Sequence, residues 1–513
     1  MKGKWRAMLA IALAGAMQLL DVSMVNIALP DIQSDLDASF NELRWVVDAN
    51  ALTLAATVLI YGSLGDRLGR RRVFVSGMVA FAALSLAAGL APTAVALDIL
   101  RGAQGLAAAA MLATALALIG GTYSGRDRNT ALGVWGGGIA LALAVGPLLG
   151  GLLVESFGWR SVFFVNVPLG VISAALVVRG VPESRDLSAT GRPDFYGLIA
   201  IAASMTLVLL ALFRGGQVGW GSPLIIGLFA GSAVLLALFI VIETRVAQPL
   251  LDLRLFRRPS TTGAFVGQLA IAASFFSVWT YLIFYLQNTL GYNPFQTGLI
   301  LFPLGLSALL GAAIAGRLAN HVPLRVLLAS ALTLAGIGML LIGGLDERSD
   351  WRAVVIGGMV AELGTGATNP AIGAIALGAA ARARSGMAAG LSATARYLGI
   401  AIGVAGLGTI LESHVGSRLQ ARLGAEEAET LEGVVSTGNI EQAAASVPAD
   451  AQATVAQVAS SAFISGINEI LIVSGLVAFA GAAVALVLVR ARDMGAEATE
   501  QVDATPLPEP TTA

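Results

Sequence analysis

The stretch GSLGDRLGRRRVF, residues 62–74, stands between two long apolar runs and decides how the rest of the chain is read. Its glycines, Gly62, Gly65 and Gly69, allow two helix ends to approach closely and turn within a few residues. Asp66 is placed to accept hydrogen bonds at a helix end. Four arginines surround it: Arg67, Arg70, Arg71 and Arg72. Positive charge of this kind is typical of cytoplasmic loops, so the stretch predicts a short basic turn between two membrane helices.

The composition indicates a membrane protein. Hydrophobic residues make up 56% of the 513 residues and charged residues 12%, whereas a soluble domain carries about 25% charged residues. The mean hydropathy is +0.80. Many apolar runs reach the roughly 20 residues that a helix needs to cross a bilayer. We therefore expect an all-α polytopic membrane protein.

The residue types that are scarce exclude several kinds of chemistry. The chain has no cysteine, which excludes disulfides, thiolate catalysis and Cys-ligated metals. Its two histidines, His321 and His414, are too far apart for a metal cluster, and its only lysines are Lys2 and Lys4. A GxxxxGKS or GxxxxGKT phosphate loop is therefore absent. We expect no cofactor, no metal and no enzyme activity, and with a net charge of −1 we expect no nucleic-acid partner.

Apolar runs between charged clusters predict fourteen membrane helices. They lie near 7–29, 44–65, 73–91, 95–120, 131–153, 161–180, 195–213, 223–242, 261–286, 296–316, 325–345, 352–378, 386–411 and 462–490. The first run follows basic residues, as in a signal peptide, but it is too long and no small-x-small cleavage site follows it. We expect it to be retained as the first membrane helix.

Positive charge predicts the orientation of these helices. With the N-terminus inside, the inner loops and tails contain 22 of the 31 Lys and Arg residues, and two more lie within spans. The outer loops contain seven: Arg44, Arg160, Arg214, Arg348, Arg352, Arg418 and Arg422. Cytoplasmic loops carry the excess of Lys and Arg, so both termini are predicted to be cytoplasmic.

Two segments lie outside the predicted spans. Residues 412–461 are acidic and Ala-rich, and we expect a long external loop in which an amphipathic helix lies near the surface. Residues 491–513 end in PLPEPTTA and are too poor in apolar residues to fold, so a disordered cytoplasmic tail is expected.

The G-x-x-x-D-R-x-G-R-R spacing of residues 62–72 matches the signature loop of the major facilitator superfamily. RGAQGLAAAA, residues 101–110, resembles the fourth-helix motif of that family, an intramembrane Arg followed by Gln-Gly and small residues. GIALALAVGPLLGGLL, residues 138–153, resembles its fifth-helix antiporter motif. The chain is thus identified as a member of this superfamily.

Further stretches resemble the fourteen-helix drug:proton antiporter branch. These are LLDVSMVNIALPDI at 19–32, WVVDANAL at 45–52, GWRSVFFVNVPLG at 158–170, YLQNTLGYNPFQTGLILFP at 285–303 and LSATARYLGIAIG at 391–403. Asn50 departs from the pattern, since the branch usually has an aromatic there, and this would alter the wall of a substrate path. The first glycine of the fifth-helix motif is replaced around Leu141 or Ala142.

The resemblance implies two six-helix bundles related by pseudo-symmetry, with two extra helices inserted between them. The implied divisions are 1–180 for the first bundle, 181–260 for the extra helices and linkers, 261–490 for the second bundle with its external loop, and 491–513 for the tail. The loop GRLANHVPLR, residues 316–325, resembles a decayed copy of the signature loop, with Asn320 near the position of Asp66.

Charged residues inside the spans are the first candidates for function. A charge at mid-bilayer costs about 2.5–3.5 kcal/mol on insertion scales. At 1.5 Å per residue, Asp21 lies about 12 Å below the outer end of its helix, and Asp48 and Arg101 reach a similar depth. In the functional interpretation, Asp21 binds and releases a proton, and Arg101 controls when it does so.

Other interpretations of these charges stay open. Asp21 and Arg101 can form a static pair that pins two helices, and Asp48 can be exposed at the interface. Arg101 can instead pair with Asp98, three residues earlier on the same helix face.

In the second half, Glu362 is the best candidate for a cationic substrate or a second proton. Arg396 is expected to pair with an acid across that bundle, such as Glu362, and Glu469 is a weaker candidate. Trp279 and Tyr281 belong to an aromatic face that either stacks on flat drugs or packs at the bilayer interface. The alternative for Glu362 is an acid that bonds to a neighbouring helix.

Other residues are expected to serve conformational change. In the signature loop these are Gly62, Asp66, Arg67, Gly69 and Arg70. In the fifth helix, Gly146, Pro147 and Gly150 predict a kink and a tight helix crossing. Proton coupling is assigned to Asp21, Asp48, Arg101 and Glu362, and substrate binding to Asp21, Asn50, Trp279, Tyr281, Glu362 and Arg396.

These features predict a monomeric antiporter of the bacterial cytoplasmic membrane, driven by protons, that exports lipophilic cationic or neutral drugs by alternating access. One alternative keeps the fold and exports a self-made antibiotic, a metabolite or a lipid. The preference for Arg over Lys and the Ala and Gly bias are typical of a high-GC organism, where such exporters are frequent. Another alternative is a membrane enzyme or a sensor that transports nothing.

Overall fold

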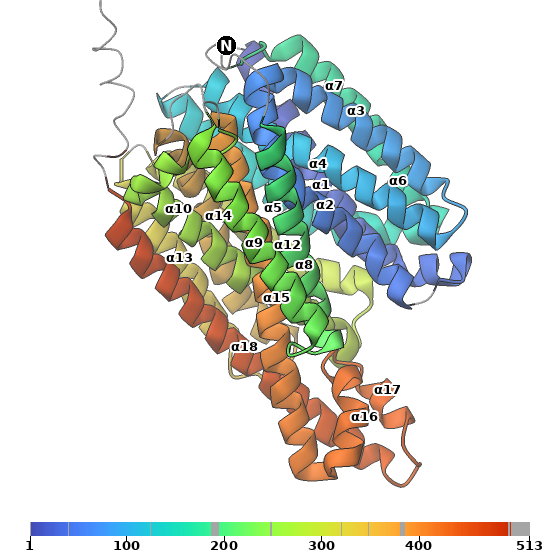
Figure 1. Ribbon diagram of the computed structural model, residues 1–513. Coiled ribbons are helices and arrows are strands. Elements are labelled where there is room, and N and C mark those ends of the chain that lie inside the picture. The colour runs from blue at the N-terminus through green and yellow to red at the C-terminus, as the bar shows by residue number, and fades with distance from the viewer. Residues whose placement is uncertain are drawn as a thin grey trace, which may run out of the picture.

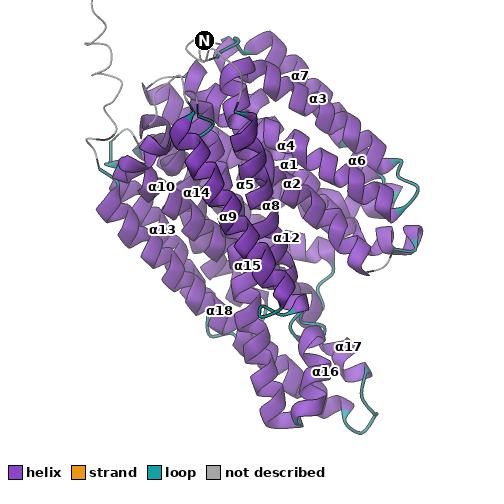
Figure 2. Ribbon diagram, viewed as in Figure 1, coloured by secondary structure: helices purple, strands orange, loops and turns teal. Residues whose placement is uncertain are grey.

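The computed structural model describes residues 2–38, 40–123, 125–185, 194–246, 249–319, 321–346, 348–379, 385–490 and Asp493. Within these residues every regular element is a helix, as Figure 2 shows. Asn320 and, in the predicted tail, residues 491–492 and 494–513 lie outside the described residues.

The first group of helices packs around α4, which is buried at every residue from Ala107 to Gly120. The group comprises α1 (Lys2–Leu36), α2 (Phe40–Leu68), α3 (Arg70–Gly89), α4 (Ala94–Thr122), α5 (Gly125–Phe157), α6 (Ser161–Phe164) and α7 (Asn166–Gly180). Thr93 caps α4 by accepting a hydrogen bond from the Ala96 N–H at 3.3 Å, as N-cap threonines do. Phe74, Phe81 and Met111 fill the core between α3 and α4.

The second group surrounds its own core. It comprises α10 (Pro259–Ile271), η2 (Ala272–Phe276), α11 (Ser277–Phe284), η3 (Tyr285–Thr289), α12 (Pro294–Leu318), α13 (Leu324–Ile342), α14 (Trp351–Ala379), α15 (Ser385–Leu423) and α18 (Gln452–Leu488), after a short 3-10 helix η1 (Leu253–Arg257). The segments from α10 to η3 form one continuous rod, 259–289, interrupted by two π-helical turns. Asn293 and Gln296 form a capping box at the start of α12, which begins that helix sharply.

Two further helices, α8 (Phe195–Val218) and α9 (Pro223–Arg245), form a hairpin between the two groups. Ser204 and Ser232 join them, since each hydroxyl donates to the other residue's carbonyl at 2.9 Å. Leu209 of α8 packs against Leu52 of α2 and Ala401 of α15. The hairpin therefore covers the seam where α2 meets α15.

The two groups meet again on the other side, where α5 packs against α12. The Cα of Gly137 leaves no room for a side chain, because an added Cβ would lie 2.4 Å from Leu309. Near the opposite end of α5, Gly298 of α12 lies against Leu148. No inserted helix covers this second seam within the described residues.

Twelve described helical segments are long and apolar enough to cross a membrane. They coincide with twelve of the fourteen spans predicted from the sequence. The remaining two predicted spans, 131–153 and 352–378, lie in the long helices α5 and α14. Within α5, the segment Val145–Phe157 is apolar but shorter than a membrane span.

The segment 412–461, predicted as a long external loop with an amphipathic helix, is helical over more of its length than expected. Helix α15 continues to Leu423, α18 already begins at Gln452, and α16 (Ala425–Val435) and α17 (Ile440–Ala445) lie between them. The apolar stripe of α15 continues at every fourth residue through Leu411, Val415 and Leu419, all buried, and apolar residues of α16 and α18 pack against it. A stripe at helical spacing with a partner surface forms a helix rather than a loop.

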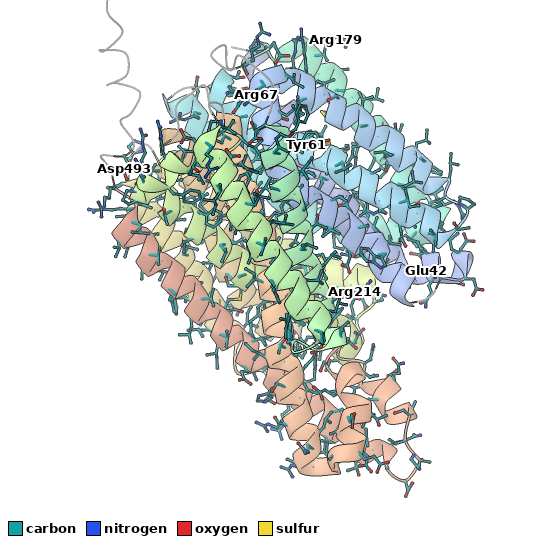
Figure 3. The ribbon with its side chains drawn as sticks, in the orientation of Figure 1. Glu42, Tyr61, Arg67, Arg179, Arg214 and Asp493 are labelled. Atoms are coloured by element: carbon teal, nitrogen blue, oxygen red, sulfur yellow. The ribbon has the colours of Figure 1, made fainter. Side chains whose placement is uncertain are left out.

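This helical extension protrudes at the end of the molecule opposite the N-terminus (Figure 1). Arg67, Arg179 and Asp493 lie toward the end that carries the N-terminus, whereas Glu42 and Arg214 lie toward the other end (Figure 3). The N-terminus and the last described residue thus share one end of the molecule.

Candidate functional site

The Asp21 carboxylate is the centre of a buried polar network. Asp21 is fully buried on α1, and its Oδ2 lies 2.6 Å from Nη1 of Arg101 on α4. Its Oδ1 accepts a hydrogen bond from Nδ2 of Asn166 on α7 at 2.7 Å and a longer one from Nε2 of Gln104 at 3.4 Å. Three helices therefore converge on one carboxylate.

Arg101 is held by acceptors on two sides. Its Nε donates to the carbonyl of Val46 on α2 at 2.9 Å, and Nη1 also donates to Oε1 of Gln104 at 2.6 Å. The guanidinium lies 5.9 Å from the ring centre of Phe163, within the range of a cation–π contact. The predicted contact between Asp21 and Arg101 is present, and the alternative pair with Asp98 is not formed.

Asn166 and Ser85 extend the network to α3. Nδ2 of Asn166 also donates to Oγ of Ser85 at 3.0 Å, and Ser85 donates to the carbonyl of Phe163 at 2.9 Å. Sequence reasoning missed Gln104, Asn166 and Ser85 as site residues. Gln104 and Asn166 stand inside the quoted stretches 101–110 and 158–170, so polarity within those apolar stretches was the available signal.

The Asp21–Arg101 pair is not explained by stability alone. Replacing a buried ion pair by apolar residues is often neutral for stability, whereas removing one partner costs about 3–5 kcal/mol because a buried charge is left alone. The two charges therefore depend on each other in this conformation.

Two other residues predicted near Asp21 have different surroundings. Asp48 is half-buried on α2, and no hydrogen bond joins its carboxyl to Asp21. Asn50 is buried and donates to the Arg101 carbonyl at 3.3 Å. Asn50 therefore joins α2 to α4 in this conformation, and its predicted place in the binding site stays a prediction.

In the second group, Glu362 is buried on α14 and makes no hydrogen bond or ion pair within the described part of the chain. The predicted pair of Glu362 with Arg396 is not formed. Glu362 lies 17 residues from the end of α14 at Ala379, whereas Arg396 lies 11 residues from the start of α15 at Ser385. At 1.5 Å per residue the two differ in depth by about 9 Å.

Arg396 instead lines a small central cavity of about 30 Å³ between the two groups of helices. Trp135 of α5 lines it from the first group, and Gln268 and Asn369 line it from the second. Gln268 is buried, and its Nε2 has no hydrogen-bond partner. The cavity has room for one or two water molecules and is bordered by hydrogen-bond donors.

The predicted aromatic face is packed rather than open. Tyr281 is buried, and its hydroxyl donates to the carbonyl of Val404 on α15 at 2.9 Å. Trp279 is half-buried, and its ring lies 5.6 Å from that of Phe275. Tyr281 is thus packed inside the protein rather than at the bilayer interface, and a role of Trp279 or Tyr281 in substrate binding stays a prediction.

The signature loop joins the two groups of helices at the end that carries the N-terminus. Oδ1 of Asp66 accepts from Nε of Arg70 at 2.8 Å and lies 2.7 Å from its Nη2. Oδ2 of Asp66 accepts from the backbone N–H of Met387, at the start of α15, at 3.0 Å. A carboxylate at a helix N-terminus is stabilised by the unpaired N–H groups there. Gly62 is buried in α2, and Arg67 interacts electrostatically with Glu243 of α9.

The turn itself depends on Gly69 and on an acid that sequence reasoning missed. Gly69 has a φ of +111°, and an added Cβ would lie 2.8 Å from the carboxyl carbon of Glu183. Glu183 accepts from the backbone N–H groups of Arg71 at 2.9 Å and Arg72 at 3.2 Å. It therefore caps α3 from 110 residues away in the chain, which no local pattern reveals.

The fifth-helix motif makes the close crossing that its sequence predicts. An added Cβ at Gly146 would lie 2.6 Å from Ser23, and one at Gly150 would lie 3.0 Å from the Met24 Cα, both on α1. Pro147 stands inside α5 and packs beside Gly298 of α12. No group of three or more His, Asp or Glu side chains that would hold a metal ion occurs among the residues the structure describes.

Comparisons with known proteins agree with this architecture. The family model described as Major Facilitator Superfamily matches residues 11–404. The tetracenomycin C resistance and export protein of Streptomyces glaucescens is 33% identical, over 94% of this chain and 91% of that protein. The multidrug resistance protein Stp of Mycobacterium tuberculosis is 34% identical, over 81% and 77% respectively. The crystal structure of the human organic anion transporter MFSD10 shares the fold with a TM-score of 0.61, 14% identity and coverage of 93% and 99%.

Proposed function

This chain belongs to the major facilitator superfamily, and from that premise and the Asp21 network we propose that it is a proton-coupled drug exporter. The relatives are named for drug resistance and export. We propose fourteen membrane helices in two pseudo-symmetric six-helix bundles, with α8 and α9 as the inserted pair and both termini in the cytoplasm of a bacterial cell. The protein acts as a monomer in this proposal.

The observation that carries the coupling proposal is the buried carboxylate of Asp21 in contact with the guanidinium of Arg101. A neighbouring cation favours the ionised form of a carboxyl, and burial without the cation favours the protonated form. Separation of Arg101 from Asp21 during the cycle then leads Asp21 to take up a proton from outside. Return of Arg101 expels the proton into the cytoplasm.

The proton gradient supplies enough free energy for export. One charge that moves through about 100 mV releases about 2.3 kcal/mol, and each pH unit adds about 1.4 kcal/mol. Export by this mechanism requires the two groups of helices to open alternately. The contact of Asp66 with Met387 is suited to hold the cytoplasmic side closed in one of these states.

The test is proton-driven uptake of a fluorescent lipophilic cation into inverted membrane vesicles. Wild-type protein should accumulate the cation when the lumen is acidic, and Asp21→Asn should abolish the response to the pH gradient. Asp31→Asn is the matched control, because Asp31 is an exposed acid on the same helix. Undiminished pH-driven uptake in Asp21→Asn would contradict the coupling proposal.

A second variant separates coupling from folding. Asp21→Asn leaves the buried cation of Arg101 without its partner, which destabilises the protein. The double variant Asp21→Asn with Arg101→Gln removes both charges and keeps hydrogen-bonding groups in place. It should unfold near the wild-type temperature and still fail to respond to the pH gradient.

A second candidate cargo is an antibiotic rich in oxygen acceptors. The central cavity of about 30 Å³ is too small to hold it in this conformation, so in this proposal the antibiotic binds the groups that line the cavity when the two groups of helices separate. The described polar groups at the cavity include the cation of Arg396 and the unpartnered amide N–H of Gln268. These groups suit carbonyl or anionic oxygens better than a cationic drug. The relative that matches over 94% of this chain is named for export of tetracenomycin C.

Two variants distinguish the cargoes. Arg396→Gln and Gln268→Leu should weaken export of an oxygen-rich neutral or anionic compound and leave export of a lipophilic cation unchanged or improved. If both variants impair the cation equally, the acceptor-rich cargo is wrong. Glu362→Gln should reduce export of the cation alone, since Glu362 is the proposed acidic site for it.

A further inference from the structure

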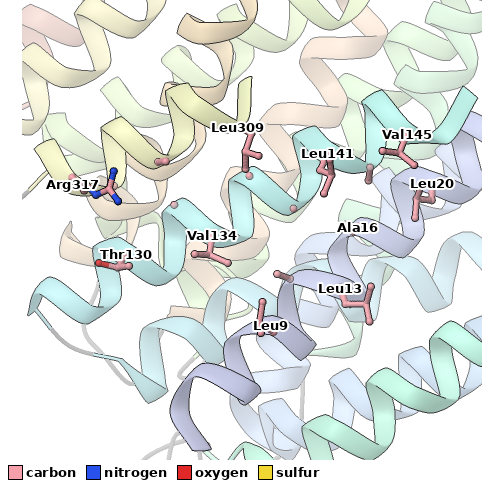
Figure 4. Close-up of a pocket in the computed structure, with 17 residues that line it drawn as sticks. Leu9, Leu13, Ala16, Leu20, Thr130, Val134, Leu141, Val145, Leu309 and Arg317 are labelled. Atoms are coloured by element: carbon pink, nitrogen blue, oxygen red, sulfur yellow. The ribbon is translucent and has the colours of Figure 1, made fainter. Parts of the chain in front are cut away.

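A groove on the uncovered seam is open to the membrane. It has a volume of about 510 Å³, with α5 as its floor and with α1 and α12 as its walls (Figure 4). Leu9 and Leu141 at this groove are 61% and 41% exposed. The groove therefore joins the first group of helices, which supplies α1 and α5, to the second, which supplies α12.

The two seams of the molecule differ in access from the lipid. On the α2–α15 seam, Leu209 of the α8–α9 hairpin packs where a lipid chain would otherwise lie. On the α5–α12 seam, small residues such as Gly133, Gly138 and Ala313 line the groove, and no element of the hairpin packs over them in the described residues. Among the described residues, the α5–α12 seam is where a hydrocarbon chain can lie between the two groups.

The length of the groove matches one leaflet of a bilayer. On α1 it runs from Leu9 to Leu20, which at 1.5 Å per residue is about 16 Å. The hydrocarbon core of a bilayer is about 30 Å thick, so one leaflet accounts for about half of that. An extended acyl chain of the leaflet at this end fits along the groove.

The ends of the groove differ in charge. Its lining is apolar except for Thr130, near the start of α5, and Arg317, near the end of α12. Both stand at the same end of the groove (Figure 4). Arg317 is exposed at the last turn of α12. Arginine binds phosphate through charged hydrogen bonds, and a basic residue at the membrane surface attracts anionic headgroups.

We propose that this groove binds one anionic phospholipid of the cytoplasmic leaflet, with an acyl chain between α1 and α12 and the phosphate on Arg317 and Thr130. The proposal uses the orientation given above, with the N-terminus inside, and it does not depend on which compound is exported. Because the lipid contacts both groups of helices, its affinity differs between states in which they sit differently. The lipid thereby shifts the balance of those states.

The experiment measures lipid binding to the purified full chain in detergent by native mass spectrometry and by thermal unfolding. The two lipids are phosphatidylglycerol, which is anionic, and phosphatidylcholine, which is zwitterionic. Wild-type protein should bind phosphatidylglycerol more tightly and unfold at a higher temperature with it. Equal binding of both lipids would overturn the proposal.

Variants locate the site. Arg317→Gln should weaken phosphatidylglycerol binding about fivefold, as expected for one basic residue at the surface, and Arg317→Lys should retain most of it. Arg245→Gln, at the exposed end of α9, is the matched control and should change nothing. If Arg245→Gln weakens binding as much as Arg317→Gln does, the lipid binds as a diffuse annulus and the proposal is wrong.

A bulky residue tests the chain-binding part. Ala313→Phe should fill the groove and lower the affinity for phosphatidylglycerol, whereas Ala230→Phe on the exposed face of α9 should not. If Ala313→Phe abolishes binding of a fluorescent lipophilic cation and leaves lipid binding intact, the groove is a drug site and the lipid proposal is overturned. If lipid binding is lost in Ala313→Phe but transport of the cation continues, the lipid proposal holds separately from the proposed function.

Discussion

Oδ2 of Asp66 accepts a hydrogen bond from the backbone N–H of Met387 at 3.0 Å, although the two residues are 321 positions apart. The other oxygen of the same carboxyl holds Arg70. One side chain thus connects the signature loop of the first group of helices to the first turn of α15 in the second. The connection lies at the end of the molecule that we propose to be cytoplasmic.

Asp66→Asn should loosen this closure. The amide oxygen can still accept one hydrogen bond, but the ion pair with Arg70 is lost, so the cytoplasmic side should open more often. The chain has no cysteine, so Ser392→Cys at the central cavity reports opening through maleimide labelling. Labelling should be severalfold faster with Asp66→Asn than with wild type. Asp127 is an exposed acid at the same end, and the control variant Asp127→Asn should leave the labelling rate unchanged. An unchanged rate in Asp66→Asn would contradict a role in closure.

Asn166→Ala should damage the Asp21 network without removing a charge. It deletes the 2.7 Å hydrogen bond to Asp21 and the 3.0 Å bond to Ser85. Loss of a hydrogen bond to a buried charged group costs about 1.5–3 kcal/mol. Thermal unfolding should show that loss, and the pH dependence of transport should shift. Ser85→Ala removes a neutral partner and should have a smaller effect on both, so equal effects would contradict the network described here.

Gly69→Ala should destabilise the turn between α2 and α3 for two reasons. The φ of +111° disfavours an L-residue, and the new Cβ would press on the Glu183 carboxyl. Gly219→Ala is the matched control, because Gly219 has a φ of +91° with no atom within 4 Å of an added Cβ. The loss of thermal stability in Gly69→Ala should exceed that in Gly219→Ala, and equal losses would show that the contact with Glu183 is unimportant.

Gly146→Ala should separate α1 from α5. The added Cβ would lie 2.6 Å from Ser23, whereas an added Cβ at Gly151 meets no atom within 4 Å. Gly146→Ala should lower both thermal stability and transport, and Gly151→Ala should be nearly neutral in both. A neutral Gly146→Ala would mean that the crossing relaxes without consequence.

The stability of the folded protein should depend on pH through Asp35, at the end of the molecule away from the N-terminus. Hydrogen bonds from Trp159 and from Arg160 lower the pKa of the Asp35 carboxyl below its ordinary value of 3.8. A lowered pKa in the folded state stabilises the protein above the ordinary value, and that stabilisation is lost as the pH falls through the lowered pKa. The unfolding temperature of wild type should therefore exceed that of Asp35→Asn at neutral pH. The difference between the two temperatures should shrink below about pH 4. A constant difference across this range would contradict the assignment.

The helical fold, the apolar segments and the intramembrane pair of Asp21 and Arg101 were accessible from the sequence. Hydropathy identifies a membrane helix because a bilayer leaves few other structures available. The equal depth of Asp21 and Arg101 followed from counting residues along two helices. The same counting would have argued against a pair of Glu362 with Arg396, which differ by about 9 Å in depth.

Other features depended on packing between distant segments. The extent of helix at 412–461 was underestimated because α15, α16 and α18 bury one another's apolar residues there. The bond from Asn50 to the Arg101 carbonyl could not be predicted, because it depends on how α2 and α4 are rotated against each other.

Composition and hydropathy were enough to predict a bundle of membrane helices, its motifs and the charges in its apolar segments. Those properties follow from the local cost of placing polar groups in lipid. The contacts of Asn166 and Gln104 with Asp21, the cap that Glu183 forms on α3 and the position of α8 over one seam became visible only in the folded chain. Such pairings depend on how helices rotate and cross, and that is set by the packing of the whole bundle.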